Sequence, residues 1–269
     1  MATFHTPEPI TADIEVAAGM VHLTAGDGAD TVVEVRPHDA ARPADVKAAE
    51  QTRVTFHHGR LSVKTPMPWI MLGRRASVDI DIALPSGSRL TAAVASAGFQ
   101  ADGEYADCRL ASASGGMLVE SVSGNIKADT ASGDITVHRA SGPVAVATAS
   151  GNLVVGELDS DLRFQTASGT LTVDRLCGNA KCQSASGGVA VAVAVSGSLS
   201  VQTASGEVEV GIPHGTAAEL DLRTRSGAVT NTLQPADGPV DDDRVLAVSV
   251  HTASGDIAVR RASSAGAAR

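Results

Sequence analysis

The segment Thr-Ala-Ser-Gly-Asp-Ile-Thr-Val, residues 130–137, holds the two patterns that decide the fold. Its first half is a turn motif, and near copies of that motif recur along the chain. They start at Ser112, Thr130, Thr148, Thr166, Ser184, Thr203, Thr224 and Thr252, and the first five spacings are 18, 18, 18, 18 and 19 residues. A weaker turn signal such as Ser123-Gly124 or Ser141-Gly142 lies midway between them. The chain is therefore a repeat protein whose 18-residue unit consists of two halves of nine.

The second half of the motif alternates apolar and polar residues, which is typical of a strand with one buried face. Adding 18 repeatedly generates four columns of expected inward residues, with one extra residue between Ala192 and Gly197. The columns are Met117, Ile135, Leu153, Leu171, Val189, Val208; Val119, Val137, Val155, Val173, Val191, Val210; Ile126, Val144, Leu162, Ala180, Leu199; and Ala128, Val146, Phe164, Cys182, Val201. This pattern predicts an all-β fold, a parallel β-solenoid with about 18 residues per coil. We expect the turn glycines to adopt positive φ and the neighbouring Ser or Thr to hydrogen-bond the turn.

The first ninety residues are rich in strand patterns but lack the 18-residue period. Strands are expected over 10–16, 20–23, 32–35, 54–56, 61–63 and 78–84, with a short helix near 43–51. We interpret residues 1–92 as a β-rich cap continuous with the stack, residues 93–262 as the solenoid repeats, and residues 263–269 as a disordered tail. Leu220, Leu222, Val229, Val248, Val250 and Ile257 keep the phase of the repeats, and 234–243 is expected to be a polar excursion between them.

Composition restricts the class of protein. Hydrophobic residues make up 43% of the chain and aromatic residues only 2%, which suits a narrow core of stacked aliphatic side chains. The formal net charge of -9 argues against nucleic acid as a partner. The start of the sequence has no export signal pattern, and three cysteines are too few for a disulfide framework. These features predict a cytoplasmic protein.

The Thr-Ala-Ser-Gly-Asp-Ile-x-Val repeats at 130–137 and 252–259 occur together with Phe-x-Thr-Pro-Glu-Pro-Ile at 4–10 and Leu-Pro-Ser-Gly-Ser at 84–88. In these motifs the chain resembles the bacterial putative-adhesin family of β-strand-repeat proteins, a domain of unknown function. The resemblance extends over nearly the whole sequence. It implies the repeat architecture and a role at a surface, and it carries no catalytic residues.

Four sets of residues are candidates for chemical sites. The repeated serines lack a recurring base, so a turn role is expected for them. The histidines have no metal-ligand spacing: His57 and His58 precede a hairpin glycine, whereas His138, His214 and His251 are isolated in the sequence. Cys182 falls in an inward column and Cys177 replaces a turn serine, which argues against a zinc site. Residues after the turn glycines form no carboxylate ladder for calcium. We expect no catalytic residue, no metal and no cofactor.

The segment 66–75 is the most unusual one, because it combines the single tryptophan, two methionines and two prolines with paired arginines. Three roles were considered for it: covering the open end of the solenoid, contacting a protein partner, or contacting a membrane surface. The candidate partner-contact residues are Met67, Trp69, Ile70, Met71, Arg74 and Arg75.

The sequence thus predicts a non-enzymatic β-solenoid scaffold or interaction module that binds a protein partner. Two alternatives stay open. One is an envelope-associated adhesin-like protein, and the other is a polysaccharide-active β-helix enzyme, which would require outward carboxylates that converge in a cleft. Membrane contact is the least favoured mode of binding, and the sequence does not determine the oligomeric state.

Overall fold

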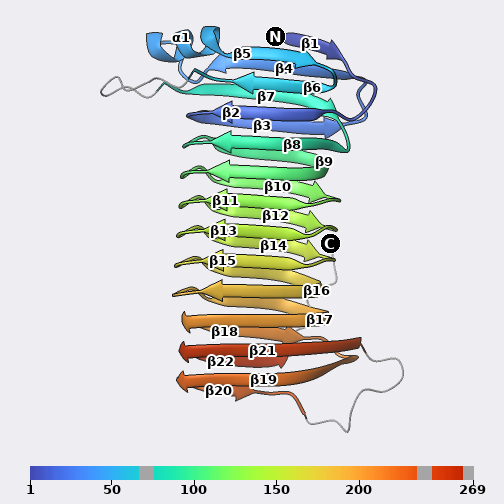
Figure 1. Cartoon of the computed structure of the whole chain (residues 1–269), viewed down its shortest axis with the longest axis vertical. Helices are drawn as coiled ribbons and strands as arrows, with labels where there is room; N and C mark the ends of the chain where they lie inside the picture. Colours follow the sequence, from blue (N-terminus) through green and yellow to red (C-terminus); the bar gives the residue numbers. More distant parts are fainter. Residues whose placement is uncertain (67–75, 235–243, 263–269) are drawn as a thin grey trace. The chain divides into compact units, whose positions relative to one another are not determined.

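The computed structural model describes residues 1–66, 76–234 and 244–262. The chain divides into two compact units, Met1–Val137 and His138–Arg269. Figure 1 shows that both units consist of strands, most of them parallel to their neighbours, with one helix in the first unit among the described residues. The all-β fold and the parallel pairing predicted from the repeats are confirmed.

The first unit contains two sheets that share the long strand β9. Their elements are β1 (Ala2–His5), β2 (Thr11–Val16), β3 (Gly19–Gly26), β4 (Asp30–Pro37), α1 (Pro43–Gln51), β5 (Arg53–His57), β6 (Arg60–Lys64), β7 (Val78–Pro85), β8 (Ser88–Val94), β9 (Gly98–Ser112), β10 (Met117–Val122) and β11 (Ile126–Thr130). One sheet runs β1-β4-β7-β3-β9-β10 and the other β5-β6-β2-β8-β9-β11. Strand β12 (Ile135–Ala140) begins in this unit and ends in the next.

The outer part of the first unit contains a helix and antiparallel strand pairs. The predicted helix is present as α1, with Pro43 in its first turn. Its buried Asp45 accepts a hydrogen bond from the amide of Ser77 at 3.0 Å. The rings of Phe4 on β1 and Phe56 on β5 stack with centroids 5.2 Å apart, so an aromatic contact joins the two outermost strands. The outer pairs β1–β4 and β5–β6 are antiparallel.

The second unit consists of parallel strands throughout its described pairs. They are β13 (Val144–Thr148), β14 (Leu153–Leu158), β15 (Leu162–Thr166), β16 (Leu171–Ser184), β17 (Val189–Ser205), β18 (Val208–Ile212), β19 (Thr216–Ser226), β20 (Val229–Asn231), β21 (Arg244–Ser254) and β22 (Ile257–Arg261). One sheet runs β13-β15-β16-β17-β21-β19 and the other β14-β16-β17-β18-β22-β20. We call the two strand segments of one repeat a layer.

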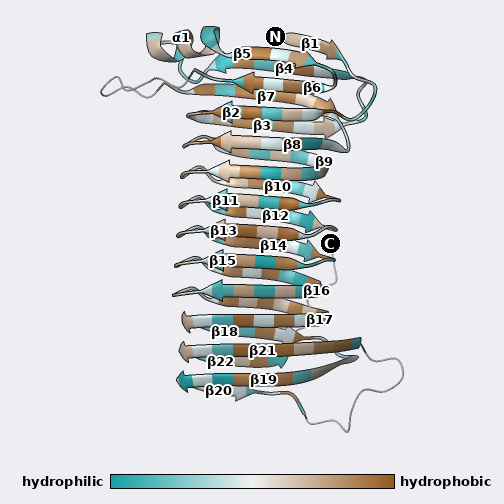
Figure 2. Ribbon diagram, viewed as in Figure 1, coloured by the Kyte–Doolittle hydropathy of each residue, from teal (hydrophilic) through white to brown (hydrophobic). Residues whose placement is uncertain are grey.

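Register and burial confirm the predicted inward residues. Leu153 pairs with Leu171 and Leu162 with Ala180, each 18 residues further along the chain. Every member of the four columns is at most 3% exposed, and Figure 2 shows apolar and polar residues alternating along the strands. Burying one such aliphatic side chain contributes about 1.5–3 kcal/mol. A fifth buried column was not predicted, because each of its residues follows the second column by three positions and so breaks the alternation of two: Val122, Ala140, Leu158, Leu176 and Ala194.

The turn glycines have a different role from the one predicted. The expectation of positive φ is wrong for most of them, among them Gly115, Gly133, Gly169 and Gly187. A Cβ added at Gly187 would lie 1.9 Å from the carbonyl oxygen of Gly169, and one at Gly169 would lie 2.0 Å from that of Gly151. Glycine is required because the backbone of each layer lies directly on the backbone of its neighbour.

The hydroxyl groups of the first four turn motifs bond the turn backbone, as predicted, whereas those of Ser184, Thr203 and Thr252 are buried without a hydrogen-bond partner among the described residues. Thr148 accepts a hydrogen bond from the amide of Gly151 at 2.8 Å, and Thr166 accepts one from the amide of Gly169 at 2.7 Å. Ser112 donates instead to the carbonyl of Gly115 at 2.8 Å. These bonds satisfy polar groups at the corners of the first four repeats, which accounts for the Thr or Ser there.

The last two layers do not follow the order of the sequence. Strand β21 pairs with β17 on one side and with β19 on the other, and β22 lies in the same way between β18 and β20. The layer formed last in the sequence is thus inserted between two earlier ones, and β19 and β20 form the outermost layer of the second unit (Figure 1). The predicted equivalence of positions in these repeats is confirmed, since Leu220 pairs with Val248 and Val229 with Ile257.

Candidate interaction surfaces

The predicted contact segment cannot be placed. Met67, Trp69, Ile70, Met71, Arg74 and Arg75 all lie outside the described residues, as does 235–243 of the predicted excursion. The chain on either side of 67–75 is held in place. Thr65 accepts a hydrogen bond from the amide of Ala17 at 3.2 Å, and Ser77 is bound to Asp45.

A charged surface lies on the outward face of the first unit, across β4, β7, β3 and β9. We call it the Met20 surface and define it by Met20, His22, Arg36, Asp79, Asp81 and Asp102. The strand register places Arg36, Asp79 and Met20 side by side in one row. Met20 is 47% exposed, and its side chain lies over the bare backbone of Gly98, where an added Cβ would come within 3.0 Å of it.

Ion pairs fix the side chains around Met20. His22 Nε2 is 2.8 Å from Asp102 Oδ2, and His22 Nδ1 is 3.6 Å from Asp81 Oδ1. Arg36 pairs with Asp81, and Gln100 donates to Asp102 at 3.0 Å. Asp81 and Asp102 are each already bonded on an open sheet face. The exposed fraction of the side chain is 38% for Asp81 and 36% for Asp102. The arrangement orders a polar rim and differs from a recessed pair of catalytic acids.

His38 extends this surface, because its Nδ1 lies 3.0 Å from Asp79 Oδ1. The hydrogen bond to Asp79 and the negative charge of that carboxylate raise the pKa of His38 above its usual 6.5. A raised pKa means that any stabilisation from the pair is present in full below pH 6.5 and is lost as the pH rises through the folded-state pKa.

We expect the imidazole of His38 to titrate above pH 6.5 in the folded protein, and Asp79→Asn to lower its pKa toward the ordinary value of 6.5. Proton NMR of the histidine Cε1 signals over a pH series measures both values. Identical titration of His38 in the two proteins would contradict the pairing.

Outward residues of the second unit form polar rows that follow the repeats. Gln165 donates to Gln183 at 3.0 Å, and Gln183 donates to Gln202 at 3.3 Å. In the adjacent row Arg163 and Lys181 lie directly opposite each other. These side chains extend into solvent, as predicted for this face.

Cys182 has the role predicted for it, since it is buried in its inward column. The turn expected at Cys177 is absent, because Cys177 lies within β16 and pairs in register with Ser196 within β17. Burial raises the pKa of the Cys108 and Cys182 thiols to about 12, so both stay protonated at neutral pH. Within the described ranges, no group of three or more His, Cys, Asp or Glu side chains is arranged to hold a metal ion.

His251, which is isolated in the sequence, has a partner in the structure. Its Nε2 lies 3.1 Å from Asp221 Oδ2, across the paired strands β21 and β19. Asp221 also accepts a hydrogen bond from Arg223 at 2.8 Å. The hydrogen bonds from His251 and Arg223 lower the pKa of Asp221. The hairpin expected at His57 and His58 is present, with φ of 49° at His58 and 73° at Gly59.

Comparison with protein families gives a match to Toastrack DUF4097 over residues 12–260. The chain belongs to the Toastrack DUF4097 family. This is a domain of unknown function, and the match confirms the resemblance drawn from the repeats. None of the curated proteins is similar to this Toastrack chain. Where the structure describes the chain, no helix has the length and apolar character needed to cross a membrane.

The solved structures that this chain matches include three bacterial proteins. A putative lipid binding protein from Parabacteroides distasonis is 12% identical with a TM-score of 0.48, covering 97% of this chain and 96% of its own. A putative cell adhesion protein from Clostridium sporogenes is 9% identical with a TM-score of 0.28, covering 97% and 98%. A putative adhesin from Bacteroides fragilis is 8% identical with a TM-score of 0.30, covering 96% and 95%.

The Met20 surface of this Toastrack domain was not predicted from the sequence. Its residues come from β3, β4, β7 and β9, which lie outside the 18-residue rhythm, so no spacing brings them together. One local signal existed: Asp79 and Asp81 alternate with Val78, Ile80 and Ile82, which places both carboxylates on the outward face of one strand.

Proposed function

We propose that this Toastrack domain is a non-enzymatic β-solenoid scaffold and that the Met20 surface is its contact with a protein partner. The observation that carries the proposal is an exposed methionine held within a rim of fixed, paired charges. Protein interfaces commonly combine an apolar anchor with a polar rim, and methionine is enriched at them. Scattered surface charges alone would not provide such an anchor.

The scaffold role is supported by the different tasks of inward, turn and outward residues in each layer. Inward columns, turn glycines and turn hydroxyls satisfy the needs of stacking, so outward residues are left to vary. A strand backbone supported on both sides by neighbouring strands holds those outward side chains in fixed register. Met20 lies on β3, which is bonded to both β7 and β9, so its position is set before any partner binds.

A photo-reactive benzophenone amino acid at position 20 tests the proposal in cells that express the full chain. We expect a discrete adduct with one protein, and we expect Arg36→Glu to weaken that adduct by altering the charged rim. The same group at position 154, which is 36% exposed on the second unit, is the matched control. Adducts of equal yield at 20 and 154, or none at 20, would exclude the Met20 surface as the contact.

A further inference from the structure

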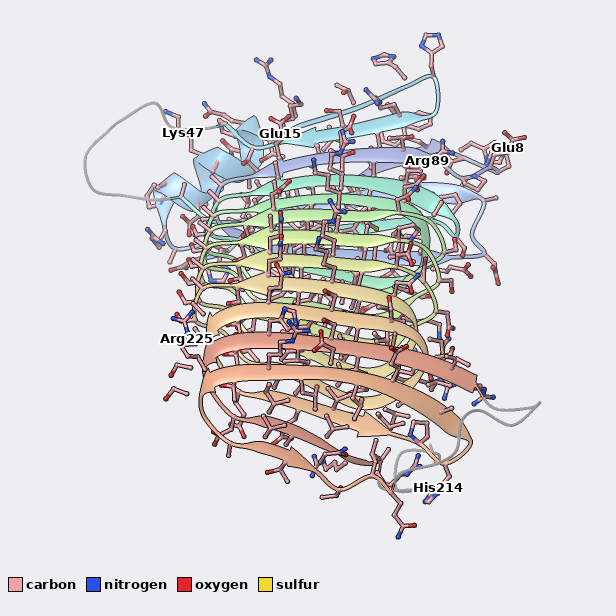
Figure 3. All side chains as sticks on the ribbon, turned by 60° about the horizontal axis from the view of Figure 1, so that its bottom comes forward. Glu8, Glu15, Lys47, Arg89, His214 and Arg225 are labelled. Carbon is pink, nitrogen blue, oxygen red and sulfur yellow. The ribbon has the colours of Figure 1, made fainter. Side chains whose placement is uncertain are left out.

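Among the described residues, the outermost layer of the second unit has a strand with one unpaired edge. In the described part of the chain β19 pairs only with β21. Val248 and Val250 on β21 are 2% and 0% exposed, whereas Leu220 and Leu222, their neighbours on β19, are half-buried. Val229 on β20 is 46% exposed, although its neighbour Ile257 is fully buried. Figure 3 shows this layer in the foreground, with side chains projecting between its two strands. The layer therefore carries apolar residues in positions that a further layer would bury.

The backbone of β19 is oriented to accept another strand. The amide of Arg244 donates to the carbonyl of Gly215, and the register continues without a shift from Thr216 to Thr224. Alternate residues of a strand direct their N–H and C=O groups to opposite neighbours. The odd-numbered residues of β19 therefore bond to β21. The even-numbered residues, Leu220 and Leu222 among them, direct their backbone groups to the uncovered edge.

The outward side chains of β19 are self-complementary in charge. In order they are Glu219, Asp221, Arg223 and Arg225, two acids followed by two bases. In an antiparallel pair of two such strands centred on Leu222, residue 221 lies opposite 223 and residue 219 opposite 225. Every acid then faces a base of the second copy. Parallel pairing in register would instead place like charges side by side, which is destabilising.

The alternation of backbone hydrogen-bonding groups along β19 also favours Leu222 as the centre of the antiparallel pair. With Leu222 directing its backbone groups outward, the pair Leu222–Leu222 exchanges both hydrogen bonds. The flanking charged residues then occupy the pairs without hydrogen bonds, where side chains are closer. Glu219 and Arg225 form no ion pair within the described residues, so both are free to pair across the edge. Figure 3 labels Arg225 near the end of β19.

From these features we propose that two copies of the chain associate through β19, antiparallel and two-fold symmetric about Leu222. Charge complementarity selects a second copy of this chain as the occupant of the edge.

Strand β20 is consistent with the same arrangement. Its even-numbered neighbours Ala228 and Thr232 bond to β22, which leaves the backbone groups of Val229 and Asn231 directed outward. An antiparallel pair centred on Thr230 would join Val229 to Asn231 of the second copy. The association does not involve the Met20 surface, and either proposal can fail alone.

Two full-length variants with opposite charge on β19 test the proposal. The acidic variant carries Arg223→Asp and Arg225→Glu, and the basic variant carries Glu219→Arg and Asp221→Arg. Analytical ultracentrifugation should give twice the chain mass of 27.1 kDa for the unmodified protein. The dissociation constant of each variant alone should be at least about tenfold higher than that of the original protein, because like charges face each other across the edge. An equimolar mixture should restore a dimer that contains one copy of each.

The fourfold exchange, with both pairs of charges reversed, is the matched control, because it is self-complementary again and should dimerise like the original. Circular dichroism confirms that each variant is folded. The proposal is overturned if the original protein is a monomer. It is also overturned if both variants dimerise as tightly as the original, or if their mixture stays monomeric.

Discussion

Val155→Asp is expected to lower the thermal unfolding midpoint of the protein by about 10 °C. Val155 is completely buried and pairs in register with Val173, so the new carboxylate has no partner in the core. An uncompensated buried charge costs about 3–5 kcal/mol, and about 1 kcal/mol shifts the midpoint of a chain of this size by roughly 2–4 °C. Differential scanning calorimetry or circular dichroism at neutral pH measures the shift.

The adjacent residue provides a matched control. Val154 is the same residue type on the same strand, but it points outward and is 36% exposed. Val154→Asp should change the midpoint by no more than about 2 °C, since the charge stays hydrated. Equal midpoints for the two variants would refute the inward orientation of Val155.

Gly115→Ala is expected to destabilise the first unit by at least about 3 kcal/mol. A Cβ at this position would lie 1.8 Å from the carbonyl oxygen of Ala97, a backbone atom that belongs to the strand-bonded neighbouring layer. Relief of the clash requires the two layers to separate locally, which breaks hydrogen bonds between them. Urea unfolding followed by circular dichroism measures the loss of stability.

Gly116→Ala is the control for this prediction, because it makes the same chemical change one residue further along. The nearest atom to its added Cβ is the carbonyl oxygen of Asp134 at 3.9 Å, an ordinary contact. Neither glycine has positive φ, so backbone strain does not separate the two variants. If Gly116→Ala were the more damaging change, close packing of layers would not be the reason for the glycine column.

The periodic part of the fold could be predicted because stacking repeats the same requirement every 18 residues. An apolar residue at 155 demands one at 173, so each inward column is visible as a series. The role of the turn glycines was misjudged for a related reason. A glycine required by positive φ and one required by a neighbouring carbonyl look alike in the sequence, and only the position of the atom one layer away distinguishes them.

The order of the last two layers could not be predicted from phase, because 216–231 and 244–261 share the same phase. The polarity of individual residues explains the order of these two layers once their positions in the structure are known. Val259 is fully buried between two layers, whereas its neighbour Asn231 is exposed in the outermost one. Exchanging the layers would bury the amide of Asn231 inside an aliphatic core, which is costly without a hydrogen-bond partner.

The Met20 surface was beyond sequence reasoning for a different reason. Its charged residues come from four strands whose separation along the chain follows no period, and pairing of β4 with β7 depends on the irregular connections of the first unit. The segment that composition did single out, around Trp69, is outside the described residues.

The inserted position of β21 and β22 has a consequence for synthesis. Residues 216–231 leave the ribosome before residues 244–261, and at that moment the edge of β17 is free. Leu220 and Leu222 have the same phase as Val248 and Val250, so β19 can occupy the place beside β17 first. The nascent chain must then either keep β19 undocked or release it. Completion of the second unit therefore cannot follow the order of synthesis by simple addition of one layer after another.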